Sequence, residues 1–573
     1  MARAIDRSAR APLILAGGAL LLVLGYLVAV PLVMLVISAF KPNGFPFESG
    51  FTLKHLVASF GNPLLPELIT NTLLFSLGST ALALLLGILL AFLLERTDLP
   101  LRNLWRGAAI LPMAIPPMLL AMAWVLLLSP RIGAINVLLS NWFGVAPGTF
   151  NIYSLSGMIF VEGMSLAPSA YLMLAAPVSN LATTMEEAAA LSGAGPLRRL
   201  RRIILPMLLP AIASAAIYLF IVGLVVFDVP GSLGIPARIF VLSTHIYNLA
   251  HNPPNSIPAL GEIGSLSFIF LIALAALGLV YRRLGRDARR FVTITGKATT
   301  PRLWDLGAWR LPVAIGLALY FVLTLVLPIA ILVWTSLLPY QARISPALVE
   351  VLNFDNYATF MRNARSFEAM KNSIIVALVS ASLVVLFSFA VATYVTRTKG
   401  PWRTGIDLLA FAPMAIPGVM IGMALIFVYL TFDALPVYGT IWIIVIAFTT
   451  EYLAYGTRSA NGVAVQVHPE LEEAGRMSGA GAWRIQRRIL IPLVLPAILA
   501  VWVWVFAHSL RALSAPLMLQ GKDNTVMVTL LWGYWNTGEI TIAAAIGVVL
   551  VGVLLIATAF WRSAASRGMN NAH

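Results

Sequence analysis

Long apolar stretches without a charged residue are the dominant pattern along this chain. The clearest of them are 11–40, 69–94, 107–130, 203–227, 311–342, 372–396, 408–432 and 540–561. Each exceeds the roughly 20 residues with which a helix spans the hydrocarbon core of a bilayer. They do not alternate between apolar and polar positions as barrel strands do, and a backbone in lipid satisfies its own hydrogen bonds as a helix. The pattern predicts an all-α membrane protein.

The edges of the apolar pattern predict about twelve transmembrane helices. Glu162 and Glu451 interrupt the fourth and the tenth of them. The first follows Arg3, Arg7 and Arg10 but is longer than the apolar core of a signal peptide, which has about 7–15 residues, so we expect it to be an uncleaved span. The predicted spans are roughly 13–38, 68–94, 106–128, 153–176, 204–228, 263–283, 311–337, 371–395, 405–431, 437–457, 489–511 and 541–562.

An internal repeat divides the spans into two halves. Residues 186–212 and 472–498, which are 286 positions apart, agree at 16 of 27 positions. A weaker match at an offset of 301 pairs Asn71-Thr72 with Asn372-Ser373 and 111–117 with 412–418. The offset falls from 301 to 286 along the chain, which predicts a 15-residue insertion in the first half, in the loop 129–152.

The repeat also predicts the domain organisation. We expect a first half over 1–290, a linker over 291–310 and a second half over 311–573, each half with six spans. Because six is even, both halves enter the membrane with the same orientation, and a pseudo-twofold axis runs along the membrane normal. The repeated polar loops, at about 180–206 and 466–492, then lie on the same side.

The distribution of charged residues predicts how the chain is oriented in the membrane. Only 11% of the residues are charged, against about 25% in soluble domains. Most of the 38 Lys and Arg residues fall in the tails, in alternate loops and in the linker, so the positive-inside rule predicts that both termini are cytoplasmic. The net charge of +15 is then a topology signal and an attraction to anionic lipid, and no nucleic-acid partner is expected. The basic residues of the linker region are Arg282, Arg283, Arg286, Arg289, Arg290, Lys297, Arg302 and Arg310.

The repeated loop has the local pattern of a short helix followed by a break. Acidic residues stand near the helix start, where the helix dipole favours them, and Ser-Gly-Ala-Gly ends the helix. Such a helix lying across the inner membrane face would fit a groove on a cytoplasmic partner, although a loop with snorkelling arginines is the simpler alternative. Near-verbatim repetition favours the docking element. The residues are Glu186, Glu187, Gly193, Arg198, Arg201, Arg202, Pro206 and Pro210, then Glu472, Glu473, Gly479, Arg484, Arg487, Arg488, Pro492 and Pro496.

These two segments resemble the EAA loop of ABC importer permeases. The first reads Glu187-Ala188-Ala189, Gly193 and Ile204-Leu205-Pro206, and the second reads Glu473-Ala474-Gly475, Gly479 and Leu490-Ile491-Pro492. Gly475 and Ile491 depart from the usual Ala and Leu. The resemblance implies a type I importer permease fold and a coupling helix that docks on a cytoplasmic ATPase dimer. The residues it assigns to coupling are Glu187, Ala188, Gly193, Glu473, Ala474 and Gly479.

The fusion of two permease domains resembles the ferric-iron importer group, which includes thiamine and some phosphonate permeases. The stretch 227–247 resembles the segment after the fifth span in that group, with Asp228 where Glu is frequent. The resemblance implies ferric iron as substrate, with thiamine, aminoethylphosphonate, polyamine or sulfate as alternatives. It also implies a periplasmic or extracellular substrate-binding protein and a bacterial inner-membrane location.

Catalytic motifs are missing from the sequence. Residues 296–298 and 521–523 contain Gly-Lys but lack the remainder of a phosphate-binding loop, so ATP and Mg²⁺ are expected on a separate ATPase chain. Neither HExxH nor GxSxG occurs, and cysteine is absent, which removes thiolate chemistry and disulfides. We expect no catalytic, cofactor or metal site. A twelve-span secondary transporter is the alternative class, but it would have no use for two EAA loops.

Ionisable residues inside spans are costly and are frequently functional. Glu162, Asp228, Glu451, His508 and Arg511 are therefore candidates for the translocation path, with structural pairing inside the bundle as the alternative.

Other polar and proline positions predict helix geometry. Asn71 and Asn372 begin equivalent spans and are predicted to cap them. Prolines inside the third and ninth spans predict kinks that free backbone groups. They are Pro112, Pro116, Pro117, Pro413 and Pro417.

Overall fold

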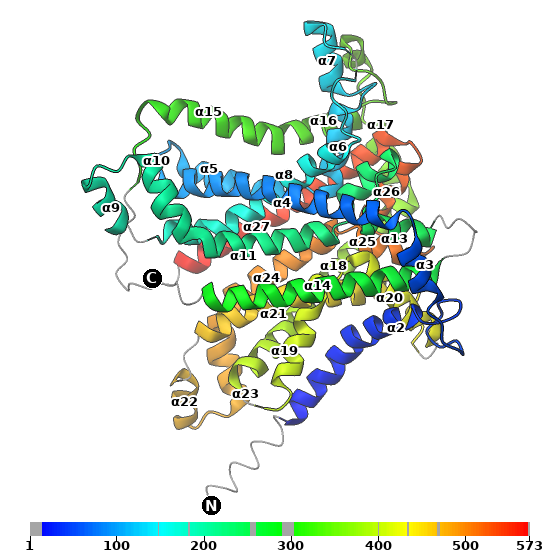
Figure 1. The fold of residues 1–573 in the computed structure, drawn as a ribbon, viewed down its shortest axis with the longest axis vertical. Helices are drawn as coiled ribbons and strands as arrows, with labels where there is room; N and C mark the ends of the chain where they lie inside the picture. Colours follow the sequence, from blue (N-terminus) through cyan, green and yellow to red (C-terminus); the bar gives the residue numbers. More distant parts are fainter. Residues whose placement is uncertain are drawn as a thin grey trace, which may run out of the picture.

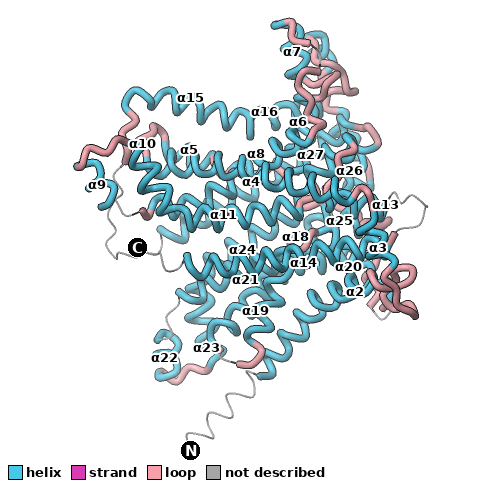
Figure 2. Tube along the Cα trace, in the orientation of Figure 1, coloured by secondary structure: helices cyan, strands magenta, loops and turns pink. Residues whose placement is uncertain are grey.

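The computed structural model is helical almost throughout, as Figure 2 shows. It describes residues 14–146, 148–181, 184–251, 259–288, 303–398, 400–432, 435–466 and 470–570. Within these ranges the only β-type pairing is one isolated bridge between Thr97 and Trp304. The prediction of an all-α protein is confirmed. Most of the predicted linker, 291–310, lies outside the described residues.

The elements of the first half run in the order span, surface helix, four further spans with short connecting helices, and a last span. They are η1 Gly25–Ala29, α2 Val30–Ser38, α3 Lys54–Gly61, α4 Leu65–Arg96, α5 Arg102–Ala108, η2 Leu111–Ala114, α6 Pro117–Leu128, α7 Ala134–Phe143, α8 Leu155–Ser179, α9 Thr184–Leu191, α10 Pro196–Arg199, η3 Leu200–Ile204, α11 Leu205–Val225, η4 Pro230–Gly234, α12 Ile235–Ala237, α13 Leu242–His251 and α14 Leu260–Ala288.

The second half repeats this order. Its elements are η6 Gly307–Trp309, α15 Arg310–Phe321, η7 Val322–Val326, α16 Leu327–Ser336, η8 Pro346–Val351, α17 Asp355–Arg362, α18 Ala364–Arg397, α19 Arg403–Phe411, η9 Ala412–Ala415, α20 Gly418–Thr431, α21 Ile441–Gln466, α22 Glu470–Met477, α23 Ala482–Ile485, η10 Gln486–Leu490, α24 Ile491–Arg511, α25 Ser514–Leu519, α26 Met527–Asn536 and α27 Ile540–Asn570.

The predicted spans all correspond to helical segments. Nine helices in the described part of the chain are long and apolar enough to cross a membrane, and counting two bent pairs as single spans gives eleven. The tenth predicted span corresponds to α21, a helix of 26 residues that is not in this set. Its apolar run is interrupted by Glu451, as the sequence had indicated.

Proline breaks the third and ninth spans more sharply than a kink. The axes of the two helical parts differ by 92° in the first half and by 115° in the second. Ile115 and Ile416, each directly before a proline, are extended, with ψ near 121° and 122°. The proline ring excludes the α conformation from the preceding residue, which explains why both breaks fall at this position. The predicted kinks are confirmed, but each is a complete interruption of the helix.

The predicted insertion contains a helix of its own. α6 and α20 begin 301 residues apart, whereas α8 and α21 begin 286 residues apart, so the extra 15 residues lie between α6 and α8. α7 occupies this segment and extends away from the bundle at the upper right of Figure 1. Only the first half therefore carries this projection.

The first helix of each half packs against the other half. In the first half, Leu24 and Val28 are buried with Val391 and Ile406 of α18 and α19. In the second half, α15 lies beside α5 in Figure 1, and the ring of Phe321 stacks on Trp105 at 5.6 Å between centroids. Separating the halves would expose these apolar contacts to solvent or lipid, so the two repeats form one interlocked body.

Asn71 and Asn372 lie inside α4 and α18, so the prediction that they cap these helices is wrong. Each helix begins several residues earlier than its apolar run, at Leu65 and Ala364. The Asn71 amide donates to the carbonyl of Phe240 at 3.4 Å, and the Asn372 amide donates to the carbonyl of Thr525 at 3.0 Å.

The residues that follow the two asparagines repeat the pattern. The amide of Leu242 donates to the Thr72 hydroxyl at 2.9 Å, and the amide of Met527 donates to the Ser373 hydroxyl at 2.7 Å. In both halves these bonds tie the segment after the fifth long helix to the second span.

Replacing Asn71 or Asn372 with leucine should lower the thermal stability of the purified protein. Each change leaves a backbone carbonyl without its donor, at a cost of about 1–3 kcal/mol. Because the two bonds are equivalent by the repeat, both variants should shift the unfolding temperature in detergent in the same direction. Asn141→Leu, at an exposed position of α7, is the control and should leave it unchanged. Unaltered melting of both core variants would contradict the assigned hydrogen bonds.

Candidate functional site

Two short loops at one end of the bundle share a single backbone geometry. We call 184–204 the first repeat loop and 470–490 the second repeat loop. Gly193 and Gly479 follow α9 and α22 with φ of +76° and +74°. The amide of Ala194 donates to the carbonyl of Ala189 at 2.9 Å, and that of Ala480 donates to Gly475 at 3.0 Å. This is the Schellman ending of a helix, for which glycine is favoured.

Both repeat loops project from the left end of the bundle in Figure 1. Each has one strongly exposed apolar side chain. Leu191 is 91% exposed and Met477 is 90% exposed, and the two occupy the same position of the repeat. An exposed large apolar residue is common by itself, but here the same exposure recurs at duplicated sites. The predicted coupling residues Glu187, Ala188, Gly193, Glu473, Ala474 and Gly479 all lie exposed on these loops.

Glu186 anchors the first repeat loop. Only 6% of this residue is exposed, and its carboxylate accepts from the guanidinium of Arg96, at the end of α4, and from the indole N–H of Trp304. Sequence reasoning missed this contact. The repeated Arg-Thr pair at 96–97 and 397–398 was a signal for Arg96, whereas a single tryptophan within the predicted linker gave none.

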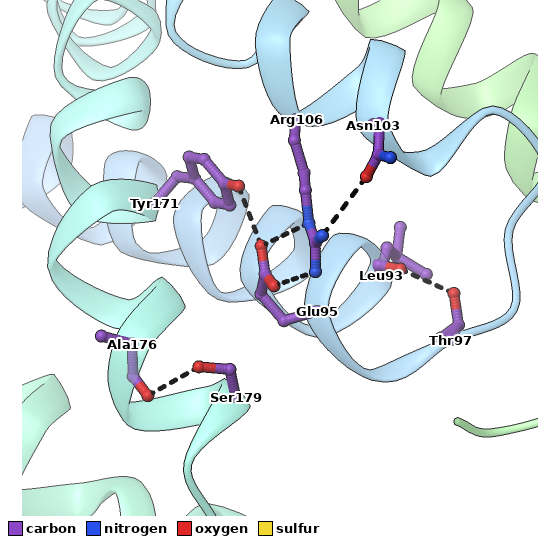
Figure 3. A network of polar contacts seen from close by, with 8 residues as sticks. All are labelled: Leu93, Glu95, Thr97, Asn103, Arg106, Tyr171, Ala176 and Ser179. Atoms are coloured by element: carbon purple, nitrogen blue, oxygen red, sulfur yellow. Dashed lines mark hydrogen bonds and ion pairs between the residues drawn. The ribbon is translucent and has the colours of Figure 1, made fainter. Parts of the chain in front are cut away.

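A second polar network lies among α4, α5 and α8, the helix that precedes the same loop (Figure 3). The Glu95 carboxylate accepts from the Arg106 guanidinium, through Nε at 3.1 Å, and from the Tyr171 hydroxyl at 3.0 Å. These residues join α4, α5 and α8. The second half has a different pair in this region, with Arg458 of α21 3.4 Å from Asp407 of α19. The halves therefore share their backbone plan but not every ion pair.

The five ionisable candidates converge inside the bundle. Glu162 comes from α8, Glu451 from α21, and His508 and Arg511 from the end of α24, while Asp228 follows α11. The guanidinium of Arg511 donates to the carbonyl of Met113 and lies 2.6 Å from Nε2 of His508. Met113 stands just before the break in the third span, where the helix leaves carbonyl groups without internal partners.

Carboxylates outnumber the cation in this group, which we call the charge cluster (Glu162, Asp228, Glu451, His508 and Arg511). The charge of Arg511 interacts with those of Asp228 and Glu162, and Asp228 also interacts with Glu451. Each of the three carboxylates keeps one buried oxygen without a hydrogen-bond partner. Such oxygens are costly to bury, so they favour a role beyond packing.

Aromatic rings form one wall of the charge cluster. The rings of Tyr455, Trp504 and His508 stack in sequence, with centroids 3.5 and 3.6 Å apart. This stack holds the His508 ring in place next to Arg511. Within the described residues, no three His, Asp or Glu side chains are grouped closely enough to hold a metal ion.

Known proteins resemble this chain along most of its length. The family model described as "Binding-protein-dependent transport system inner membrane component" matches residues 83–288 and 384–570. The ferric transport system permease protein FbpB of Actinobacillus pleuropneumoniae is 25% identical over 550 residues, which are 95% of this chain and 77% of that protein.

Two further relatives extend the comparison. The putative ferric transport system permease protein FbpB 1 of Haemophilus influenzae is 25% identical over 88% of this chain and 78% of its own length. The putative 2-aminoethylphosphonate transport system permease protein PhnV of Salmonella typhimurium is 22% identical over 41% of this chain and 87% of its own length.

Proposed function

The chain belongs to the family of binding-protein-dependent transport system inner membrane components, and we propose that it is the fused permease of an ATP-driven importer for ferric iron. Membership of this permease family explains why the chain is a multi-pass inner-membrane protein with two homologous halves. ATP hydrolysis is assigned to a separate chain, since no phosphate-binding loop occurs in this sequence.

The duplicated repeat loops are the observation that carries the proposal. One ATPase subunit binds each loop, and Leu191 or Met477 enters an apolar groove on that subunit. The two loops are related by the internal repeat, as the two subunits of an ATPase dimer are related by its symmetry. The positive-inside rule puts this end of the bundle, and both termini, in the cytoplasm. A periplasmic or extracellular binding protein then delivers substrate at the opposite end.

The charge cluster lines the translocation path in this proposal. Three carboxyl groups and one guanidinium belong to this cluster, so it offers more oxygen acceptors to a cation than donors to an anion such as a phosphonate. Hard cations such as ferric iron prefer oxygen ligands, and the unpartnered oxygens of Glu162, Asp228 and Glu451 supply them transiently. The full-length relatives named as ferric permeases support the same cargo.

Uptake by cells distinguishes ferric iron from aminoethylphosphonate. A strain that lacks this chain should fail to accumulate labelled ferric iron at limiting concentration, and the intact chain supplied in trans should restore accumulation. The same strain should still use aminoethylphosphonate as its phosphorus source. The reverse pattern would reject iron as the cargo and favour the phosphonate.

Isolation of the complex tests the importer assignment itself. Tagged protein purified from native membranes in mild detergent should bring down an ATPase at two subunits per chain. Recovery of the permease without any ATPase would contradict the assignment.

Replacing Gly193 and Gly479 together with valine should uncouple ATP hydrolysis from transport. A non-glycine residue in this left-handed conformation costs roughly 1–2 kcal/mol, so both docking turns would rearrange. An added Cβ meets no atom within 4 Å at either site, so the chain should still insert and fold. Transport and ATP hydrolysis by the reconstituted complex give the coupling ratio.

The same loops supply the control for the glycine variants. Gly195 and Gly481 also have open space around an added Cβ, but their φ angles are not positive. The double variant Gly195→Val with Gly481→Val should therefore keep the coupling ratio. Normal transport in the Gly193→Val, Gly479→Val protein would show that the turn has no role in coupling.

A further inference from the structure

We propose that Trp304 clamps the first repeat loop to the second half of the chain, so that the two repeat loops are held differently. Trp304 precedes the first helix of the second half, yet its contacts are with α4 and the first repeat loop of the first half. The inference rests on the proposed function, because the clamped loop is the one assigned to ATPase docking.

The backbone of Trp304 is fixed by pairing with the end of α4. Its amide donates to the carbonyl of Arg96 at 2.7 Å, and its carbonyl accepts from the amide of Asp98 at 3.1 Å. The Asp98 carboxylate accepts from the amide of Leu306 at 3.0 Å and pairs with Arg310. Hydrogen bonding from Arg310 lowers the pKa of Asp98, so this link is intact at neutral pH.

The side chain of Trp304 contacts the first repeat loop both before and after the Gly193 turn. Its indole N–H donates to Glu186, at the start of α9, and the guanidinium of Arg199, from α10, lies 4.8 Å above its ring. The ring also meets Phe92 edge-on at 5.1 Å between centroids. One side chain therefore contacts both helices that flank the Gly193 turn, and it fixes their relative position.

The charge of Glu186 makes this clamp strong. A buried carboxylate needs all its donors, because an unpaired charged oxygen keeps the full cost of its desolvation. Arg96 supplies one donor from within the first half, and Trp304 supplies the other from the segment before α15. Because α15 packs along the first half through Phe321, a shift of α15 moves Trp304 and, with it, the first repeat loop.

The segment before the first span does not supply a counterpart of Trp304. In the first half, residues 1–13 precede the first span and contain no tryptophan, phenylalanine or tyrosine, and the first tryptophan of the chain is Trp105. The second repeat loop therefore has no equivalent indole from residues 1–13.

Trp304→Ala in the assembled complex tests the clamp with two readouts. Spin labels at Met185→Cys and Ala308→Cys, in a chain with no native cysteine, report the separation of α9 from the segment before α15. The distance distribution should be narrow in the parent protein and broad in Trp304→Ala. Substrate transported per ATP hydrolysed should fall about tenfold, the equilibrium effect of one lost hydrogen bond to a charged group. Trp304→Phe keeps the ring and should give a smaller change in the same direction.

Trp309→Ala is the matched control, because this tryptophan is exposed and lies in the same segment. It should alter neither readout. An unchanged distance distribution in Trp304→Ala, or a broadened one with a normal coupling ratio, would overturn the clamp. Failure of the parent chain to bind any ATPase would instead reject the proposed function, while the distance measurement would still decide whether Trp304 holds the loop.

Discussion

Replacing Leu191 and Met477 together with aspartate should abolish ATP-driven transport and the recovery of the ATPase with the permease. Each side chain is about nine-tenths exposed and stands two residues before the glycine of its docking turn. Burying a Leu or Met side chain in a partner's groove contributes about 1.5–3 kcal/mol. Aspartate removes this contribution and adds the cost of desolvating a charge, so docking should weaken by more than a hundredfold at each loop. Sedimentation of detergent-purified complexes with limiting ATPase measures the loss.

The single variants and a distant control sharpen this test. Leu191→Asp and Met477→Asp alone should each leave one loop docked, with weaker binding and lower coupling. Phe143→Asp, an exposed apolar position on α7 at a distance from the repeat loops, should bind the ATPase normally. Full ATPase binding by the double variant would show that the exposed apolar residues are not the contact.

Arg511→Met should eliminate transport and also destabilise the permease. The guanidinium is the cation of the charge cluster, and its removal takes away the positive charge that interacts with Asp228 and Glu162. Removing one partner of a buried ion pair costs about 3–5 kcal/mol. The carbonyl of Met113, at the break in the third span, also loses its donor. Uptake by proteoliposomes and the unfolding temperature in detergent measure the two effects.

A compensating variant separates stability from transport. Adding Asp228→Asn to Arg511→Met removes one of the unpaired charges, so the unfolding temperature should recover in part. Transport should not recover, since the path then lacks both a carboxylate and its cation. Arg511→Lys keeps the charge but not the planar donor geometry, and an intermediate rate is expected. A double variant that transports normally would assign these residues a structural role only.

The sequence predicted the helices and the repeat because both are local properties. Apolar length locates a span without knowledge of its neighbours, and duplicated residues identify equivalent loops. The breaks at Pro116 and Pro417 were predicted as kinks only, since their angle depends on the extended residue before proline and on packing. Asn71 was misassigned because α4 extends beyond its apolar run, and sequence does not reveal where such an extension begins.

The candidate site was predictable residue by residue but not as a group. Glu162, Asp228, Glu451, His508 and Arg511 each stood out as ionisable positions in or beside spans. Their convergence follows from tertiary packing of α8, α21 and α24, and no repeat offset pairs Glu162 with Glu451. Nothing in the sequence indicated a contact for Trp304, because an aromatic residue in a predicted linker is common and has no single structural meaning. The sequence alone does not reveal contacts between residues that are distant along the chain.

The most direct test of the central claim is iron uptake by proteoliposomes that contain this chain with its ATPase and binding protein. Uptake of ferric iron should require ATP on the side of the repeat loops, should stop when ATP is removed, and should be indifferent to the collapse of proton and sodium gradients. Iron uptake that continues without ATP while an ion gradient is maintained would contradict the account and identify the chain as a secondary transporter.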